Sequence, residues 1–176
     1  MRIHFRKAEA TLGQTMGKED ETVRFLVQRV TRASVTIEGK ETGRIGLGFF
    51  VLIGSEDTDT KEIADKMVSK LLGLRIFEDE NGKSNLALAD VGGELLLISQ
   101  FTLLADASHG NRPSYIHAGR PEMSEPMYDY ICNSCREQGY SVQTGVFGAE
   151  MKCDLLNDGP FTIWLDSREI CPKLHH

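Results

Sequence analysis

The stretch Glu94-Leu95-Leu96-Leu97-Ile98-Ser99-Gln100-Phe101-Thr102-Leu103 decides the fold of this chain. Its first half is an apolar run, which is typical of a strand buried on both faces. Its second half changes to serine, glutamine and threonine. A buried strand with this ending brings hydroxyl and amide groups to the edge of a sheet, so we expect a site there.

A second stretch, Asn157-Asp158-Gly159-Pro160-Phe161-Thr162, has the composition of a tight turn that leads into a strand over residues 161–165. Only about 5–6% of X-Pro bonds in folded proteins are cis, so the pattern alone predicts a trans Gly159-Pro160 bond.

Together these stretches resemble the two signature motifs of the D-aminoacyl-tRNA deacylases, Ser-Gln-x-Thr and Asn-x-Gly-Pro-x-Thr. The resemblance covers roughly residues 23–167. Further blocks that resemble the family follow its order: Gln28–Val35, Leu74–Asp79, Asn111–Ser114 and Gly145–Met151. A relative that acts on L-alanyl-tRNA carries Pro-Gln-x-Thr and Thr-x-Gly-Pro, so Ser99 and Asn157 place the chain on the D-specific side.

Length and composition favour a single domain. The chain has 176 residues, 40% of them hydrophobic and 26% charged, and no run approaches the roughly 18 apolar residues of a membrane helix. We expect residues 23–167 to form the domain and residues 168–176 a C-terminal tail. Residues 1–22 are interpreted as a flexible extension or a cloning remnant, with Met16 near a natural start and His175-His176 as the stub of a tag.

Periodicity predicts an α/β fold with a mixed, largely antiparallel sheet or split barrel and two main helices. The first helix, of about 14 residues, is expected to begin at a Thr58 or Asp59 cap, and the second to run from Pro121 or Ser124 to Gln138. Strands are predicted at residues 24–30, 33–37, 49–54, 74–77, 94–98, 141–146, 151–156 and 161–166.

The formal net charge of -6 argues against a broad electrostatic grip on nucleic acid. We therefore expect no DNA partner and no membrane partner, and a small footprint confined to the 3′ end of a tRNA. Arg112 lies in a polar stretch and is interpreted either as a phosphate contact or as a solvated loop arginine.

Four cysteines follow a start that lacks the long apolar segment of a secretory leader, so we expect free thiols in a reducing cytoplasm. Cys132 and Cys135 form a C-x-x-C on about one helical face. A metal or redox role is one reading of this pair, and buried thiols are the other.

Catalysis by side chains has weak support in the sequence. A hydroxyl nucleophile such as Thr102 or Ser99 needs a base within hydrogen-bond reach. The candidate bases, His109 and His117, lie outside the blocks that resemble the family, and no nucleophile elbow or metal-hydrolase motif is present.

The resemblance implies another chemistry, without metal or cofactor. In the family, the 2′-hydroxyl of the terminal tRNA ribose assists the water that cleaves the aminoacyl ester, and backbone amides stabilise the oxyanion. The matching amides are those of Phe101 and Thr102, within a motif that also contains Ser99 and Gln100. An older reading makes the Thr102 hydroxyl the nucleophile.

The resemblance also implies a homodimer. In the family the Gly-Pro peptide is cis and reaches into the partner subunit's pocket, where it excludes L-amino acids. Gly159 and Pro160 would do so here, and D-amino acids and glycine on tRNA(Ala) would be accepted.

Three further residues match substrate-site positions. Arg29 matches an arginine that supports the Gly-Pro element, although a salt bridge at a sheet edge is the other reading. Phe147 and Met151 match residues that line the adenosine pocket, and ordinary core positions are the alternative.

Two other functions stay open at the level of sequence. A non-catalytic module would bind a 3′-adenosine analogue and leave the ester intact. A conventional esterase would use Thr102 or Ser99 and cleave simple activated esters without tRNA.

Overall fold

Strand β6 (Glu94–Ser99) lies inside the main sheet, as its apolar run predicts: all four residues from Leu95 to Ile98 are buried. The computed structural model describes residues 22–175. Met16, the rest of the predicted extension up to residue 21, and His176 lie outside the described residues.

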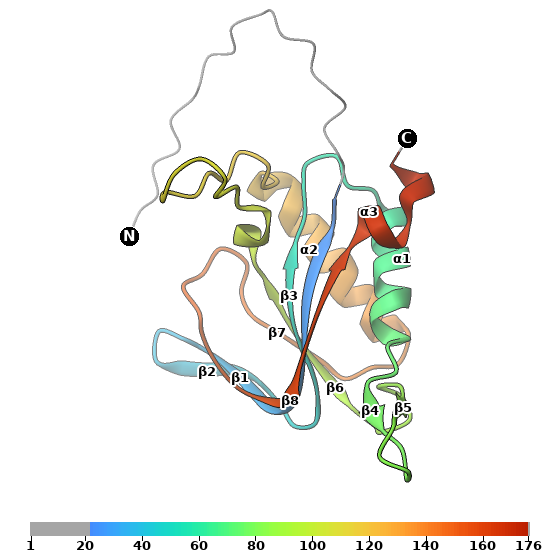
Figure 1. The fold of residues 1–176 in the computed structure, drawn as a ribbon. Helices are drawn as coiled ribbons and strands as arrows, with labels where there is room; N and C mark the ends of the chain where they lie inside the picture. The colour runs from blue at the N-terminus through green and yellow to red at the C-terminus, as the bar shows by residue number, and fades with distance from the viewer. Residues whose placement is uncertain (1–21, 176) are drawn as a thin grey trace, which may run out of the picture.

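Six strands form this sheet, in the order β2-β1-β3-β6-β7 with β8 paired to β1 (Figure 1). Strands β3 and β6, and β6 and β7, are parallel, whereas β1 is antiparallel to its three partners. The other elements of the described part of the chain are a short hairpin, two main helices and three short helical turns. The bounds are β1 Arg24–Ile37, β2 Lys40–Ile45, β3 Gly48–Gly54, α1 Lys61–Leu72, β4 Phe77–Glu78, β5 Ser84–Leu86, η1 Phe101–Leu104, α2 Pro121–Glu137, β7 Val142–Thr144, β8 Lys152–Asp166, α3 Ser167–Ile170 and η2 Pro172–Leu174.

The sheet curls until its two ends approach each other. A Cβ built at Gly43 of β2 would lie 3.2 Å from the carbonyl oxygen of Thr144 in β7. The result is a mixed sheet in the form of a nearly closed barrel with two main helices, which confirms the fold class predicted from the sequence.

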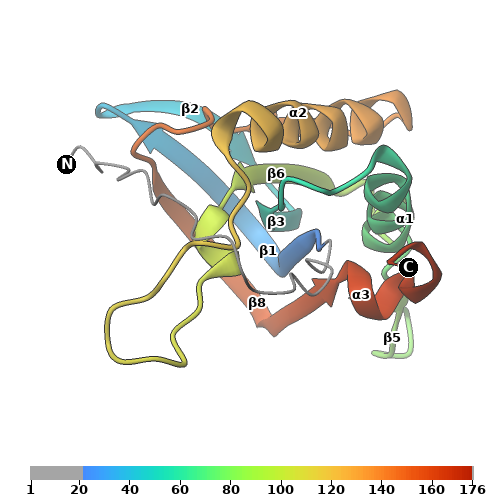
Figure 2. The ribbon, with the colours of Figure 1, turned by 90° about the horizontal axis from the view of Figure 1, so that it is seen from above.

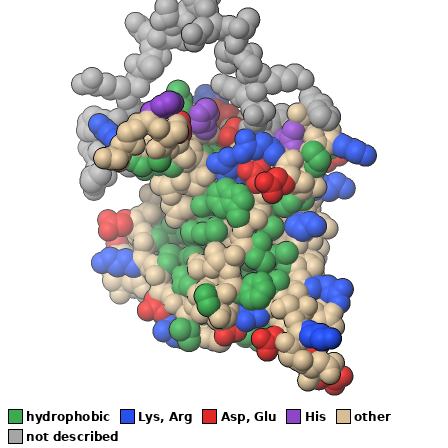
Figure 3. Space-filling model, viewed as in Figure 1, with side chains coloured by type: hydrophobic (Ala, Val, Ile, Leu, Met, Phe, Trp, Pro, Cys, Tyr) green, Lys and Arg blue, Asp and Glu red, His purple; other side chains and the backbone are tan. Residues whose placement is uncertain are grey.

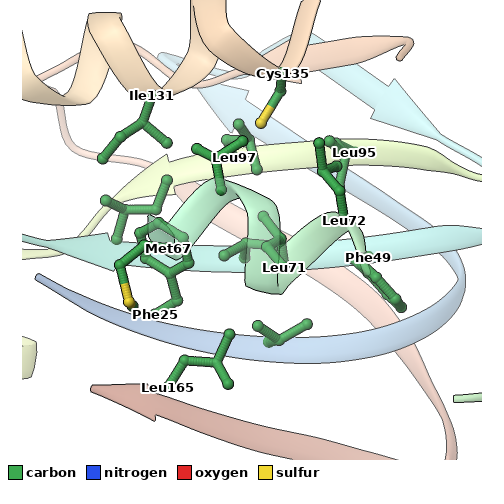
Figure 4. Packing of buried hydrophobic residues seen from close by; sticks show 14 of the residues in the cluster. Phe25, Phe49, Met67, Leu71, Leu72, Leu95, Leu97, Ile131, Cys135 and Leu165 are labelled. Carbon is green, nitrogen blue, oxygen red and sulfur yellow. The ribbon is translucent and has the colours of Figure 1, made fainter. Parts of the chain in front are cut away.

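Helices α1 and α2 pack on one side of the sheet (Figure 2). Their apolar stripes, including Met67, Leu71 and Ile131, meet buried residues of β1, β3 and β6 such as Phe25 and Phe49 (Figure 4). None of the helices within residues 22–175 is long and apolar enough to cross a bilayer.

The start of α1 differs from the prediction by one or two residues. Thr60 is the N-cap, and its hydroxyl accepts a hydrogen bond from the N–H of Ile63 at 3.3 Å. The carboxylate of Asp59 instead accepts from the N–H of Glu56, within the preceding turn. The helix that follows has 12 residues.

Two pairs of predicted strands are each a single long strand. β1 runs through Thr31 and Arg32, with register shifts against β8 that let it bend from one part of the sheet to the next. β8 likewise continues through the predicted turn at Asn157, whose neighbours bulge out of the ladder.

The strand predicted at residues 74–77 is wrong except at Phe77, where β4 begins. The carbonyl oxygen of Ile76 accepts a hydrogen bond from the Arg29 guanidinium. This bond uses the backbone acceptor with which a neighbouring strand would otherwise pair.

The domain extends beyond the predicted boundaries. Thr22 is fully buried, and its hydroxyl donates to Asp166 at 2.9 Å. The predicted tail forms α3 and η2, and Cys171 between them is buried, with Leu174 packed against the main core. The C-terminal residues up to His175 are therefore part of the folded structure.

Candidate active site

Three parallel strands end at the same edge of the sheet. β3 ends at Gly54, β6 at Ser99 and β7 at Thr144. The loops that follow them therefore meet at one end of the barrel, which is where parallel strands usually place a ligand. The predicted Ser-Gln-x-Thr motif and the stretch containing Phe147 and Met151 are both in these loops.

The backbone turns immediately after β6. The N–H of Gln100 still donates to the Ile53 carbonyl at 2.6 Å, and η1 begins at the next residue. The first N–H groups of a helical turn have no partner inside it. Within residues 22–175, neither the N–H of Phe101 nor that of Thr102 makes a hydrogen bond. Two adjacent donors are thus available at the strand tip, and such a pair can bind an oxyanion.

The side chains of the motif do not form a nucleophile–base pair. The Thr102 hydroxyl accepts a hydrogen bond from the amide of Gln100, and an amide cannot take up a proton. Ser99 is half-buried at the end of β6, whereas His109 and His117 are exposed in the loop that follows η1.

Phe147 and Met151 both lie near the end of β6. Phe147 has its ring centroid 6.2 Å from that of Tyr128, whose hydroxyl donates to the Leu97 carbonyl at 2.8 Å. Met151 covers Gly145, since a Cβ built there would collide with the Met151 sulfur. Both side chains are half-buried, so each packs on the core and keeps an accessible part.

Gly159 and Pro160 form the exposed part of a bulge in β8. Gln28 of β1 pairs with Thr162, and Val30 pairs with Asn157. Residues 158–161 of β8 therefore lie opposite Arg29 alone and protrude from the sheet. The Gly159-Pro160 bond is cis, as the resemblance implies and against the expectation from the turn pattern. Gly159 has φ +123°, which an L-residue rarely adopts.

Arg29 holds this bulge from inside. It is 5% exposed, and its Nε donates to the carbonyl oxygen of Asp158 at 3.2 Å and pairs with the Asp158 carboxylate at 3.2 Å. Its guanidinium carbon lies 4.8 Å from the centre of the Phe161 ring, and a second nitrogen donates to Ile76. The contact expected from the resemblance is present; its functional role stays a prediction.

Asn157 was not predicted to have a role of its own beyond the motif. Its Nδ2 donates to the carbonyl of Phe161 at 3.0 Å, and its Oδ1 accepts from the N–H of the same residue at 3.1 Å. The side chain thus closes the base of the bulge. A sequence signal existed, because asparagine commonly bonds to nearby backbone.

The two motifs are far apart within one chain. The bulge lies opposite Arg29, which pairs with Phe49, and Phe49 pairs with Leu95 of β6. Ser99 is four residues farther along β6. The separation is therefore about 14 Å across the sheet and about 13 Å along its strands.

The C-x-x-C cysteines are buried in α2. Burial raises the pKa of Cys132 to about 11 and that of Cys135 to about 12, so both are protonated thiols at neutral pH. Within residues 22–175, no group of three or more His, Cys, Asp or Glu side chains is arranged to hold a metal ion.

Comparison with known proteins identifies the family. A family model described as D-Tyr-tRNA(Tyr) deacylase matches residues 26–166. The chain belongs to the D-aminoacyl-tRNA deacylase family. Membership makes it a hydrolase of this class, and it confirms the resemblance seen in the motifs.

Curated family members are similar along nearly their whole length. The D-aminoacyl-tRNA deacylase of Anaeromyxobacter dehalogenans is 50% identical over 148 residues, which cover 84% of this chain and 99% of that protein. The deacylase of an Escherichia coli strain is 49% identical over 140 residues, covering 80% and 97%. That of Flavobacterium johnsoniae is 49% identical over 147 residues, covering 83% and 98%.

Solved structures agree with the deacylase fold. A protein titled c-Myc DNA Unwinding Element Binding Protein has a TM-score of 0.76 and 41% identity, over 81% of this chain and 97% of that one. A probable eukaryotic D-amino acid tRNA deacylase has a TM-score of 0.72 over 82% and 99%. At 20% identity, the second likeness supports the fold alone.

Proposed function

We propose that the chain removes D-amino acids from tRNA at a pocket shared by two subunits. One subunit contributes the tip of β6 and η1, and its partner contributes the Gly159-Pro160 bulge. The observation that carries this proposal is the pair of N–H groups at Phe101 and Thr102 that make no hydrogen bond to any of residues 22–175, in a motif without a side-chain base.

The proposed reaction combines these groups with the chemistry that the family resemblance implies. Water adds to the carbonyl carbon of the ester, assisted by the 2′-hydroxyl of the terminal ribose, and the two N–H groups donate to the oxyanion that forms. The bond to the ribose 3′-oxygen then breaks. That oxygen takes up the proton released by the attacking water, and the free D-amino acid and the tRNA are released. No metal or cofactor takes part in these steps.

Stereochemical selection is assigned to the bulge. The exposed backbone of Gly159 and Pro160, supported by Arg29, would face the Cα of the substrate and leave no space for an L side chain. Because a backbone wall contacts Cα and not the rest of the side chain, D-amino acids of different size would be accepted. Glycine has no side chain to reject, so glycyl-tRNA(Ala) is also a proposed substrate.

The separation of the two motifs supports a pocket between subunits, because one chain cannot bring them together. The sheet also has an uncovered apolar face. Trp164, Leu26 and Leu52 are neighbours on β8, β1 and β3; Trp164 is 45% exposed and the other two are half-buried. Figure 3 shows apolar side chains gathered in the centre of this face. A second copy of the chain would cover them.

The first test is deacylation of matched D-Tyr-tRNA and L-Tyr-tRNA by the purified protein with EDTA present. We expect rapid loss of the D ester only, at a rate that EDTA does not change. Gly159→Ala forces an L-residue into φ +123°, so it should weaken D-specific activity or selectivity. Equal loss of both esters by the wild type would contradict rejection of L-amino acids by the bulge.

The same assay separates the two alternatives. A binding module would leave both esters intact while it binds a 3′-adenosine analogue. An esterase that uses Thr102 would lose more than about 1000-fold in rate in Thr102→Ala. The proposed mechanism predicts that this variant keeps most of its activity, because the backbone N–H of residue 102 is unchanged.

A further inference from the structure

The loop formed by residues 105–118 is fixed beside the proposed oxyanion donors. Asp106, two residues after η1, and Ser114 exchange two backbone hydrogen bonds of 2.8 Å, so the far part of the loop is held close to the end of η1. Just after the loop, the N–H of Gly119 donates to the Ser55 carbonyl at 2.9 Å, and Arg120 pairs with a carboxylate of the β3–α1 turn. The loop thus lies at the edge of the sheet where β3 and β6 end, next to the proposed oxyanion donors (Figure 1).

Large apolar side chains are exposed at this place. Phe101 is 47% exposed, Tyr115 is 42% and Ile116 is 80%. The Phe101 and Tyr115 rings form an edge-to-face pair with centroids 5.1 Å apart. Accessible aromatic faces at the end of a site are suited to stacking of unpaired bases.

The loop carries one arginine, one aspartate and two histidines, in a chain whose net charge is -6. Arg112 is exposed, and within residues 22–175 it has no carboxylate partner. The only acid of the loop is Asp106. Hydrogen bonds from Ser108 hold its pKa low, and the nearby imidazoles of His109 and His117 add to the effect. Figure 3 shows histidine and basic side chains around this edge.

We propose that loop 105–118, together with the Phe101 ring, binds the single-stranded nucleotides that precede the terminal adenosine of the tRNA. Tyr115 would stack on a base, and Arg112 would contact a phosphate. The ligand is inferred from continuity. In the proposed site the Phe101 N–H donates to the oxyanion formed from the terminal ester, and the Tyr115 ring of the loop contacts the Phe101 ring, so the strand that leaves the terminal ribose would pass over both. This inference rests on the proposed function.

The test compares a substrate that reaches the loop with one that does not. D-Tyr-tRNA carries the preceding nucleotides, whereas the D-tyrosyl ester of adenosine has neither a phosphate nor a second base. Tyr115→Ala should lower kcat/KM for D-Tyr-tRNA by about 5- to 100-fold, and Tyr115→Phe should retain the wild-type value. Neither variant should change hydrolysis of the adenosine ester.

Arg112→Ala should lower kcat/KM for the tRNA only, and it should reduce the slope of log(kcat/KM) against log[salt] by about 1. Arg136→Ala is the matched control, because it removes an exposed positive charge from the last turn of α2, the opposite end of the helix that follows the loop. It should leave both values unchanged.

Equal losses on both substrates, or no loss on either, would overturn the nucleotide-binding role of the loop. Dissociation of the dimer by Tyr115→Ala, measured by sedimentation, would assign the surface to subunit contact instead. Failure of the wild type to cleave either substrate would overturn the proposed function itself, and the inference with it.

Discussion

At the scale of a single residue, the proposed oxyanion binding depends on the backbone N–H of Phe101. It is the first donor of η1, and its position follows from the place where β6 stops pairing with β3. A side-chain substitution leaves this group in place, so alanine scanning of the motif cannot detect it. Proline at position 101 removes it directly.

Phe101→Pro should lower the rate of deacylation by about 100- to 1000-fold relative to Phe101→Ala, which loses the ring but keeps the N–H. Proline is generally tolerated at the first position of a helical turn, and Gln100 has φ -146° and ψ 83°, outside the helical region that proline disfavours in the residue before it. Single-turnover hydrolysis of D-Tyr-tRNA measures the ratio of the two rates. Equal rates would exclude the Phe101 amide from oxyanion binding.

At the scale of elements, the β8 bulge depends on one buried arginine. The Arg29 guanidinium bonds to Asp158 and Ile76 and stacks on Phe161. A lysine has a single ammonium group and cannot replace this fork of donors. The bulge is therefore expected to lose its shape when the guanidinium is removed, even if the positive charge is kept.

Arg29→Lys should lower the free energy of unfolding by about 2–4 kcal/mol and reduce the preference for D-Tyr-tRNA over L-Tyr-tRNA. Urea denaturation and paired deacylation assays give the two values. Arg32→Lys is the control, because Arg32 forms an exposed pair with Asp154, and it should change stability by less than about 0.5 kcal/mol. An unchanged D/L ratio in Arg29→Lys would separate Arg29 from selectivity.

Elements with a strong local pattern were predictable from the sequence. β3, β6 and α2 carry their apolar run or stripe within a short window, and Gly139 ends α2 with φ +89°. The continuity of β8 was not predictable, since Asn-Asp-Gly-Pro fits a turn equally well. Whether it closes a hairpin or bulges depends on how β1 pairs on both sides of it.

For the candidate site, the sequence predicted which residues belong to it, but not how their backbone groups are arranged. The Ser-Gln-x-Thr and Gly-Pro blocks identified its residues through family resemblance, and the structure adds which backbone groups are free. Whether a backbone N–H group lacks a hydrogen bond depends on where strand pairing ends. The identities of the side chains do not show where that is. The exposure of Tyr115 was also not predicted, because an aromatic residue in a polar loop looks the same in sequence whether it is buried or not.

At the scale of the whole molecule, one carboxylate ties the two ends of the domain together. Asp166 at the end of β8 accepts hydrogen bonds from Thr22, Arg24 and Arg168. Burial raises the pKa of Asp166, but these bonds outweigh it and hold the pKa well below the usual value. A carboxylate with a depressed pKa stabilises the folded state above its unfolded pKa of about 3.9, and this stability is lost as the pH falls below it.

Asp166→Asn should therefore lower the free energy of unfolding by about 2–4 kcal/mol at pH 7. The difference from the wild type should shrink by up to about 1.4 kcal/mol for each pH unit below about 4, because the wild type then loses its charged form. Urea denaturation at pH 7 and pH 3 measures both effects. Asp154→Asn removes an exposed carboxylate and serves as the control; a pH-independent difference for Asp166→Asn would contradict the ionic role.

The central claim is that each active site takes its oxyanion donors from one subunit and its Gly-Pro bulge from the other. Mixing unfolded Phe101→Pro and Gly159→Ala chains and refolding them together tests it most directly. A shared pocket predicts that the mixed dimer regains one intact site, so that D-specific hydrolysis of Tyr-tRNA recovers to about a quarter of the wild-type rate per chain. If each chain formed its own pocket, every site would carry one of the two defects, and the mixture would show no recovery above the mean of the separate variants.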